Sequence, residues 1–535
     1  MPEAIRYDLL HEPWIPCERP DGSHILAGIE DVLVEAHTFA VIHDESPLAT
    51  ATLHRLLLAI LQRVLLPRTM EDWIALWQAP EFDAARVRAY LTKWKDRFDL
   101  FHPDRPFLQV ANLSEVLRKE RGKEPERTEA WRMAMESSAH SNATQLLDPL
   151  PPEAALSPPR AALALLGFLA FTPGGRIQNE TDSWDAANVR GGAVVLIRGD
   201  TLYRTLMMNL LWQRDRASPD LPPWERSESA ERKTRPPFGF VDQLVWQSRR
   251  VQLFAEKREG GQVLVRDVVT AAGEQFDVEH PDPMFAYAVR DPKKPPMAIR
   301  IDRDRSVWRD AAALFDIAAG AEDLRPRACV QLAELIREGE LPRTTRLRLE
   351  LLGLAGNKAS IRLWRADRVP LPPSLLVDGE RVSTLRRGLE LAEALGAAVF
   401  LQVLRILAEN ALAPSRREPH ADDISNLRAA LGSMPAYWAA LGQAFPLWLD
   451  ALGSADDLDA MLGAWKDTLR GTARDVVRDA ELRIGTGARA LQAGAKAQRA
   501  LRRSLRDVLG QESAVSRAQN PHATTEIRTR EGVSG

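Results

Sequence analysis

The sequence predicts an α+β protein, with a large mixed α/β N-terminal domain over residues 1–375 and a C-terminal four-helix bundle over residues 385–510. Two observations predict this division. Short strand-like segments and apolar helices alternate up to residue 375, whereas four amphipathic helical segments follow one another after residue 385. Beyond residue 510 the chain becomes polar and loses its periodicity, which predicts a disordered tail over residues 511–535.

The composition is that of a globular protein with more than one domain. The chain has 535 residues, of which 45% are hydrophobic and 27% are charged. A net charge of −3 weighs against a free-standing nucleic-acid binder, which is usually basic, but suits a subunit that touches nucleic acid in a few places. Cys17 and Cys329 are far apart, which excludes a disulfide framework and fits a reducing cytoplasm. No membrane span and no secretory signal are expected.

The first part of the N-terminal domain alternates between extended and helical segments. Residues 7–15 are expected to be extended, with prolines that restrict them to a sheet edge or a strand end. Apolar residues at helical spacing predict a buried helix over residues 50–66, and a second helix covers residues 84–94. Residues 111–160 are polar and rich in proline, and an apolar helix follows over residues 161–171.

The middle of the chain is rich in strand-like segments. GGAVVLIRG predicts one strand, residues 238–254 predict one or two strands, and residues 282–302 predict a pair around a proline-lysine loop. The clearest hairpin covers residues 347–364, where LRLEL alternates with a period of two, AGNK supplies the turn and ASIRLW resumes the strand. Asn357 suits the positive φ of a tight turn, so Lys358 is expected at or beside the tip.

Four apolar seams predict the bundle. Between residues 427 and 452 the spacing alternates between four and three, and Pro435 and Pro446 predict a kink or a break in that helix. The other seams consist of Leu385, Leu389, Ala392, Val399, Val403 and Ile406; of Leu458, Leu462, Trp465, Leu469 and Val476; and of Leu491, Leu501, Leu505 and Val508.

Motifs that mark common enzymes are missing from the sequence. The 10 histidines show no H-E-x-x-H or other metal-ligand spacing, and neither a G-x-S-x-G elbow nor a G-x-x-x-x-G-K-[ST] loop occurs. His11 and Glu12 are adjacent and would point to opposite faces of a strand, which makes a poor catalytic dyad. We therefore expect no catalysis, no metal and no cofactor.

Segments along the whole chain resemble one family. LLHEPWIP near the N-terminus is similar to the Leu-Leu-x-Glu-Pro-Trp-Ile-Pro with which CasA-type large subunits of the type I-E CRISPR Cascade complex typically begin. The further similar segments, in the expected order, are ESPLATATLHRLLLAIL, WKDRFDLFHPDRPFLQ, SNATQLLD, FTPGG, RGGAVVLIRGDTLYRTLMMNLL, FVDQLVWQSRRVQL and LLGLAGNKAS. The resemblance extends from about residue 7 to about residue 510 and includes the bundle.

The resemblance implies a non-enzymatic, cytoplasmic subunit of an RNA-guided complex. Its partners would be the other Cascade subunits, a CRISPR guide RNA, double-stranded target DNA and a recruited helicase-nuclease. Such subunits contact the protospacer-adjacent motif (PAM), help to open the duplex for R-loop formation and provide a docking surface for the nuclease, while base pairing recognises the sequence. The alternative is a purely structural scaffold subunit that does not recognise DNA.

The hairpin is the first site that the resemblance implies. In related proteins it is a wedge inserted into the duplex beside the motif, commonly with a glutamine at its end. The similar segment here is Gly356, Asn357, Lys358 and Ala359, with Lys358 at the glutamine position. Lysine can neutralise a phosphate but cannot both donate and accept as an amide does, which predicts a different or looser motif preference. Alternatively, Lys358 is a solvated turn residue.

A glycine loop is the second implied site. In the family a glycine-rich loop lies against the minor groove, where the missing side chains allow close approach of the backbone. Gly174 and Gly175 are the favoured pair here, and Gly191 and Gly192 are the alternative. Without the resemblance, Gly174 and Gly175 would simply end a helix.

Two further loops carry candidate contacts. A basic finger of the family enters the minor groove, and the comparable residues are Arg290, Lys293 and Lys294, among which the sequence does not choose. A loop near the 5′ end of the guide and the flanking motif is similar to Ser141, Asn142, Ala143 and Thr144, whose amides suit phosphate contacts. In both cases a solvated surface loop is the alternative.

Basic residues of the last bundle helix complete the candidate set. They lie largely off its apolar seam and are Lys496, Arg499, Arg502, Arg503 and Arg506. The resemblance implies a bundle beside the backbone subunits and the DNA, so these residues would bind phosphates without sequence preference and with strong salt dependence. The alternative is a solubilising outer face.

Overall fold

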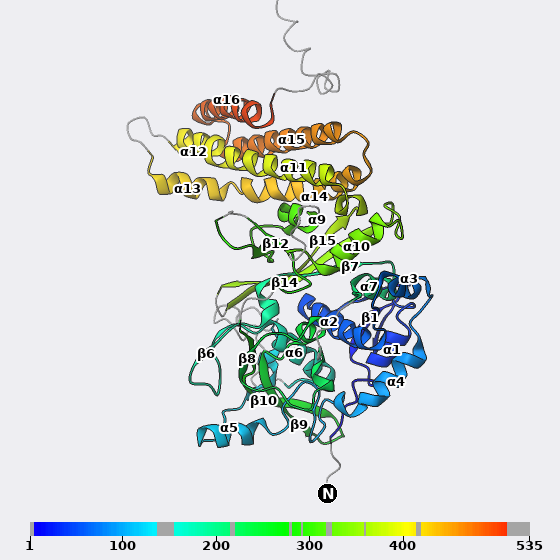
Figure 1. Cartoon of the computed structure of the whole chain (residues 1–535). Coiled ribbons are helices and arrows are strands. Elements are labelled where there is room, and N and C mark those ends of the chain that lie inside the picture. The colour runs from blue at the N-terminus through cyan, green and yellow to red at the C-terminus, as the bar shows by residue number, and fades with distance from the viewer. Residues whose placement is uncertain are drawn as a thin grey trace, which may run out of the picture. The chain divides into compact units, whose positions relative to one another are not determined.

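The chain forms two compact units, Met1–Val377 and Asp378–Gly535. The computed structural model describes residues 5–135, 155–213, 220–277, 281–289, 293–316, 324–357, 360–412 and 419–510 (Figure 1). The described part of the first unit mixes helices and strands, and that of the second is helical. The predicted α+β class, with a mixed N-terminal part followed by a helical bundle, is confirmed. Residues 511–535, for which we expected a disordered tail, lie outside the described residues.

Helices of the first unit agree with the apolar periodicity in most places. The predicted helices over residues 50–66, 84–94 and 161–171 are confirmed, but the polar region after residue 111 also contains a helix, α5. The helices are α1 (Ile29–Val34), α2 (Pro47–Val64), α3 (Met70–Gln78), α4 (Ala84–Trp94), α5 (Leu113–Arg121), α6 (Pro158–Phe171), α7 (Leu202–Asn209), α8 (Phe240–Leu244), α9 (Ala312–Phe315) and α10 (Arg327–Arg337).

Strands of this unit form small separate sheets rather than one large sheet. The described sheets have the strand orders β2-β1-β3, β4-β10-β9, β11-β8, β12-β13, β15-β14-β7 and β5-β6. The strands are β1 (Ile15–Glu18), β2 (His24–Ala27), β3 (Val41–Ile42), β4 (Thr128–Glu129), β5 (Gly175–Arg176), β6 (Ser183–Trp184), β7 (Val194–Arg198), β8 (Lys233–Arg235), β9 (Arg249–Lys257), β10 (Val263–Ala272), β11 (Glu274–Phe276), β12 (Tyr287–Ala288), β13 (Met297–Ala298), β14 (Leu347–Asn357) and β15 (Ser360–Leu371).

Two strand predictions are wrong in part. The extended segment expected over residues 7–15 contains a turn, and β1 begins only at Ile15 and is the middle strand of its sheet. The segment expected to form one or two strands over residues 238–254 begins with helix α8 and contains the single strand β9. In both places short-range alternation of apolar residues was not sufficient to distinguish a strand from a turn or a short helix.

Helix α2 lies at the centre of the first unit. Leu53, Leu57 and Ile60 are fully buried, and the helix packs against α6, α8 and β14. It begins after Ser46, whose hydroxyl accepts a hydrogen bond from Ala49 N, and Pro47 occupies its first turn, where a missing N–H costs nothing. Its polar residues His54, Arg55 and Gln62 are buried as well, so the helix is covered on nearly all sides, in agreement with its central position.

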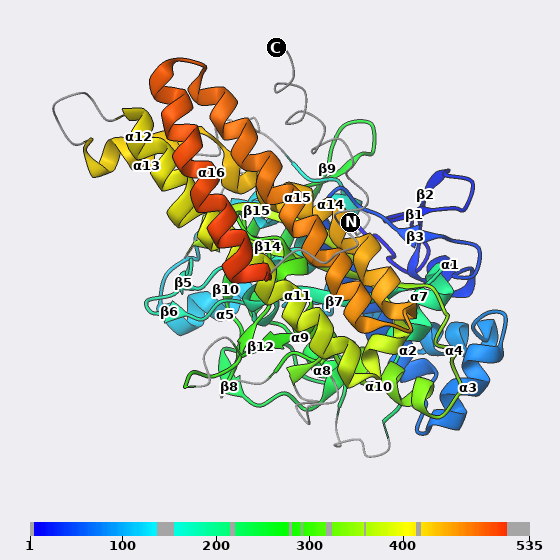
Figure 2. The same ribbon diagram turned by 90° about the horizontal axis from the view of Figure 1, so that it is seen from above.

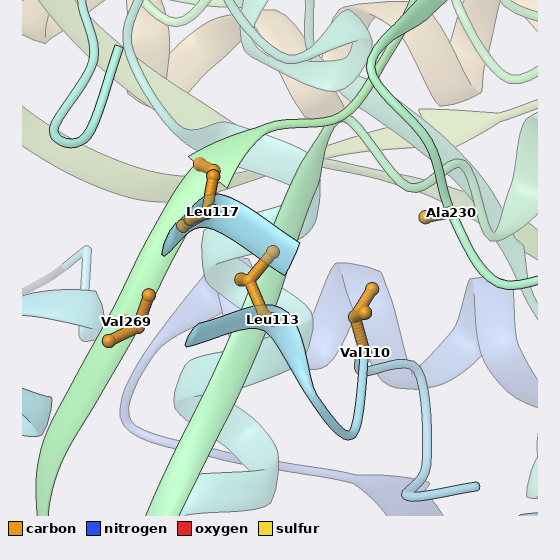
Figure 3. Close-up of a cluster of buried hydrophobic side chains, with 6 residues drawn as sticks. Val110, Leu113, Leu117, Ala230 and Val269 are labelled. Atoms are coloured by element: carbon orange, nitrogen blue, oxygen red, sulfur yellow. The ribbon is translucent and has the colours of Figure 1, made fainter. Parts of the chain in front are cut away.

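Helix α5 covers the pair of long strands β9 and β10 with one apolar face. Leu113 and Leu117 are fully buried there with Val110 and Val269, as Figure 3 shows. The opposite face ends in a basic last turn, and Gly122 closes the helix with a φ of 70°. This packing fixes the end of α5, and therefore Arg121, beside the loop that follows α6.

The second unit consists, in its described part, of four helical rods. The first is α11 (Gly379–Ala398), a π-helical turn (Val399–Val403) and α12 (Leu404–Leu412), and the second is α13 (Ala421–Ala430) followed by α14 (Ser433–Ser454). The third and fourth are α15 (Leu458–Ile484) and α16 (Ala488–Leu509). α11, α15 and α16 pack against one another, as Figure 2 shows (yellow-green to red).

The seams agree with the prediction in most places. Among the exceptions, Tyr437 rather than Trp438 is buried in α14, and Leu509 rather than Val508 is buried in α16. The second rod breaks at Gly432, which has a φ of 63°, so Pro435 falls in the first turn of α14, while α14 continues through Pro446. Leu491 is 64% exposed, and the buried face of α16 instead begins with Ala493. In the first rod, Leu407 rather than Ile406 is fully buried, because the π turn shifts the helical phase.

One helix of the described residues, Gly379–Leu412, is long and apolar enough by length and composition to cross a membrane. It is the first rod of the bundle, and 44% of its most apolar window is buried. Leu385, Leu395 and Val403 are fully buried where the rod packs against α15 and α16. The apolar character of this helix is therefore that of a bundle seam.

Candidate nucleic-acid interface

The hairpin β14–β15 has a continuous antiparallel ladder from Leu347–Leu371 to Asn357–Ser360. Its register shifts between Ala355 and Gly356, a bulge that increases the twist close to the turn. Gly356 is exposed. Lys358 and Ala359 connect the last pair and lie outside the described residues. The predicted hairpin is confirmed, and the role of its tip stays a prediction.

A polar network that the sequence did not reveal holds the base of this hairpin. Glu350 of β14 is 3% exposed and pairs with Arg368 of β15 (Nε–Oε1 3.0 Å) and with Arg198 of β7 (Nε–Oε2 3.5 Å). Arg198 Nη1 also lies 3.1 Å from His54 Nε2, and His54 Nδ1 lies 2.8 Å from Thr50 O. Because a guanidinium can only donate, Nε2 accepts and Nδ1 carries the proton.

His54 should make the stability of the first unit pH-dependent. Burial and the nearby Arg198 lower its pKa to about 4, compared with roughly 6.5 in an unfolded chain. Between these values the unfolded state binds more protons, so acid favours unfolding. We expect the free energy of unfolding to fall by about 2 kcal/mol between pH 8 and pH 5 through this residue alone. Denaturant unfolding at both pH values measures it.

The contribution of His54 is isolated by comparing pH dependences. His54→Gln should remove about 2 kcal/mol of the change between pH 8 and pH 5, whereas His24→Gln, at an exposed position of β2, should retain the wild-type change. An identical pH dependence in wild type and His54→Gln would show that the imidazole does not titrate as the geometry implies.

Gly174 and Gly175 lie where α6 leads into the small hairpin β5–β6. A Cβ atom on Gly174 would lie 2.6 Å from Ala186 N, so this glycine is required by the close approach of two backbone segments. Gly175 has a φ of 122° and is exposed, with open space where a Cβ would be. Both residues belong to the segment 173–186, the glycine loop.

The alternative glycine pair has a different setting. Gly192 is buried, and a Cβ there would lie 2.4 Å from the ring of Phe285. Its missing side chain is thus explained by core packing, whereas Gly175 presents bare backbone at the surface. This comparison favours Gly174 and Gly175 as the pair that a ligand could approach.

Three side chains anchor the glycine loop to the rest of the unit. Asn179 has a φ of 60°, and its Nδ2 donates to Glu126 O (3.0 Å) and Thr270 O (3.1 Å). Glu180 accepts a hydrogen bond from Ala272 N (3.0 Å) and forms ion pairs with Arg121, Arg232 and Arg250. The third anchor is Arg249, whose Nη2 donates to Pro173 O (3.0 Å) and Asp185 O (2.8 Å). The loop is therefore held at both ends and in the middle.

The basic finger lies between β12 and β13, which pair in antiparallel register. Lys293 and Lys294 are exposed, and Arg290 lies outside the described residues. Val289 (56% exposed) and Met297 (48% exposed) flank the connection. Ser141, Asn142, Ala143 and Thr144 also lie outside the described residues, so their roles stay predictions.

The basic residues predicted on α16 share its solvent-facing side. All five are exposed, while Ala497, Leu501 and Leu505 face the bundle interior. Lys496 Nζ also donates to Asn410 Oδ1 of α12. These five residues are Lys496, Arg499, Arg502, Arg503 and Arg506.

The described residues offer no cluster of metal ligands and two buried cysteines. No group of three or more His, Cys, Asp or Glu side chains there could hold a metal ion. Cys17 and Cys329 are both buried and unpaired, and burial raises the pKa of each thiol to about 12. Thiols with such pKa values are poor nucleophiles at neutral pH.

Comparison with known proteins places this arrangement in a family. The family model of the CRISPR-associated protein Cse1 matches residues 8–476. This chain belongs to the Cse1 family. It is 33% identical over 529 residues to the CRISPR-associated protein CasA/Cse1 of Thermus thermophilus, covering 95% of this chain and 98% of that protein. The resemblance on which the sequence predictions were based is confirmed.

Solved structures share the fold across nearly the whole chain. The structure of Thermus thermophilus CasA (Cse1) matches with a TM-score of 0.77 and 31% identity over 94% of this chain and 99% of that one. A chain of a CRISPR RNA-guided surveillance complex matches with a TM-score of 0.69 and 21% identity over 93% of this chain and 99% of that one. The second likeness concerns the fold alone.

Proposed function

We propose that this Cse1-family chain is the non-catalytic large subunit of an RNA-guided CRISPR surveillance complex. In this role it recognises the protospacer-adjacent motif of double-stranded DNA, promotes duplex opening and R-loop formation, and provides a docking surface for a helicase-nuclease. Its partners are the other Cascade subunits, the guide RNA and the target DNA in the cytoplasm. Family membership supports the assembly, and the hairpin carries the proposal of motif recognition.

The hairpin suits a wedge because it is stiff at its base and narrow at its end. The ladder of β14 and β15 is continued by β7, and the buried Glu350 connects all three strands. Beyond β7 only two strands remain, and the chain returns within two residues after Asn357. A lysine at this end, Lys358, brings a positive charge toward phosphates that flank the motif.

The glycine loop, the finger and the bundle supply the other contacts in this proposal. Gly175 exposes backbone that can approach a minor groove, and Lys293 or Lys294 adds positive charge there. The basic face of α16 binds phosphates without sequence preference. The motif is thus recognised at the hairpin and glycine loop, while the bundle adds affinity.

Binding to flanking-motif variants tests the proposal. The guide-RNA complex is reconstituted with and without this chain, and its affinity is measured for duplexes that carry every motif variant. We expect discrimination among motifs to require the chain. Lys358→Ala should reduce the preference for the best motif by roughly 10-fold, which is the effect of one lost contact.

Lys123→Ala provides the control, because Lys123 is an exposed lysine elsewhere in the same unit. It should leave discrimination unchanged. If discrimination requires the chain but Lys358→Ala has no effect, the role stands and the residue is wrong. If binding and discrimination are the same without the chain, it is a structural scaffold and the proposal fails.

A further inference from the structure

A cavity of about 270 Å³ lies directly beside the glycine loop. Its wall is formed by the end of α6, by β5 and β10 and by the segment that follows β4, and it is far larger than the roughly 15 Å³ that one water molecule needs. Arg132, Arg176 and Arg249 all line it, and none of its lining residues is acidic. Arg176 and Arg249 form no ion pair with a described carboxylate, so their positive charge in this cavity points to an anionic ligand.

Arg249 is the most unusual of the three. It is 1% exposed, and among the described residues its guanidinium donates only to carbonyl oxygens, those of Ser248 (2.8 Å), Pro173 and Asp185. No described carboxylate forms an ion pair with it. Burial lowers its pKa to about 10, although the charge of Asp185 acts in the opposite direction. A buried cation without a direct counter-ion is costly, and an anion in the cavity would offset that cost.

The other two arginines stand at more accessible positions. Arg176 directly follows Gly175 in β5, is exposed, and has no ion-pair partner among the described residues. Arg132 follows β4 and pairs with Glu129 (Nε–Oε2 2.7 Å). Thr128 and Thr172 also line the cavity and bring hydroxyl groups that can donate to an oxyanion.

We propose that this cavity binds a backbone phosphate of the target DNA. Guanidinium groups match the oxygens of a phosphodiester with parallel hydrogen bonds, and hydroxyl groups complete the set of donors. The choice of DNA rests on the proposed function, in which the adjoining glycine loop lies against the minor groove. Arg249 then has two tasks: it fixes the loop through Pro173 and Asp185, and it supplies the buried charge of the phosphate site.

Loss of Arg176 gives the sharpest test, because this side chain is exposed and its removal leaves the loop anchors intact. In the reconstituted complex, Arg176→Gln should weaken duplex binding roughly 5- to 10-fold for every flanking motif alike. The slope of log Kd against log salt concentration should decrease by about 1, as for one lost phosphate contact. Arg19→Gln, at an exposed turn beside β1, removes the same charge elsewhere and should change neither quantity.

Duplexes with single methylphosphonate substitutions beside the motif locate the phosphate. At one position the neutral linkage should weaken binding to the wild-type chain and bring it level with Arg176→Gln. Equal affinity and equal salt slope for wild type and Arg176→Gln on all duplexes would overturn the proposal. It would also be overturned if Arg176→Gln weakened association of the chain with the guide-RNA complex before DNA is added, because the phosphate would then belong to the guide.

The variant Arg249→Lys retains the positive charge but loses the parallel N–H donors of the guanidinium group. It should weaken binding of unmodified duplex more than binding of the methylphosphonate duplex. These readouts are separate from motif discrimination, which belongs to the proposed function. A complex that discriminates motifs normally but shows no effect of Arg176→Gln would reject the phosphate site alone.

Discussion

Glu180→Ala should lower the free energy of unfolding of the first unit by about 3–5 kcal/mol. The Glu180 side chain is 1% exposed and faces three arginines, of which Arg121 and Arg250 are themselves largely buried. Its removal leaves Arg121 without an ion-pair partner among the described residues, and leaves Arg250 with Glu120 and Arg232 with Asp182 as their remaining partners. It also leaves Ala272 N without its acceptor. Denaturant unfolding of the full chain, with hydrogen exchange of β10 as a local probe, measures the loss.

Two variants separate the charge from the position. Glu180→Gln retains the shape and one acceptor oxygen, so its loss should be smaller than that of Glu180→Ala. Glu126 contacts the anchor Asn179 through its backbone carbonyl, and its carboxylate is exposed. Glu126→Ala removes this carboxylate and should change the free energy of unfolding by less than about 0.5 kcal/mol. If Glu180→Ala were as stable as Glu126→Ala, the arginine cluster would not depend on this carboxylate.

Trp465→Ala should destabilise the bundle by about 3–5 kcal/mol. Trp465 is 1% exposed and stacks on Trp448 with ring centroids 4.6 Å apart, and its Nε1 donates to Gly388 O (3.0 Å). A Cβ on Gly388 would lie 2.4 Å from Trp448, so the stacked rings fill the space that this glycine leaves. Such a close fit cannot collapse around the void that alanine would create.

Hydrogen exchange of α11 and α15 reports on this loss within the second unit. Trp465→Phe preserves most of the buried apolar volume and should cost less than half as much. Leu447→Ala, at a site that is 75% exposed on α14, serves as the matched control and should have an effect within about 0.5 kcal/mol. A Trp465→Ala bundle as protected as that of Leu447→Ala would mean that the ring stack does not support the core.

Local periodicity predicted the parts of the fold whose signal lies in consecutive residues. The hairpin β14–β15 follows from the alternation in LRLEL and from the turn residues Gly356 and Asn357, and α2 and α4 follow from apolar spacing. The first rod shows where such an extrapolation fails. An α-helical period continued through Val399–Val403 points to Ile406, but the π turn adds one residue to that stretch and buries Leu407 instead.

The anchors of the candidate site could not be predicted because they join distant parts of the chain. Glu180 pairs with arginines at positions 121, 232 and 250, and each of those arginines, taken alone, has the sequence signature of a solvated charge. Arg249 and Arg250 are adjacent in β9, and nothing in the sequence indicates that Arg250 pairs with carboxylates whereas Arg249 bonds to backbone carbonyls. The resemblance located the glycine pair, but only the structure distinguishes Gly175 from the packed Gly192.

The burial of both cysteines makes it possible to label the hairpin selectively with a fluorescent dye. Cys17 and Cys329 are both buried, and burial raises the pKa of each thiol to about 12, so a dye reaches neither of them and little reactive thiolate forms at pH 7. A cysteine introduced at position 358 would therefore react with a maleimide dye before either native thiol. The wild-type background is thus already suited to placing a single fluorophore on the hairpin.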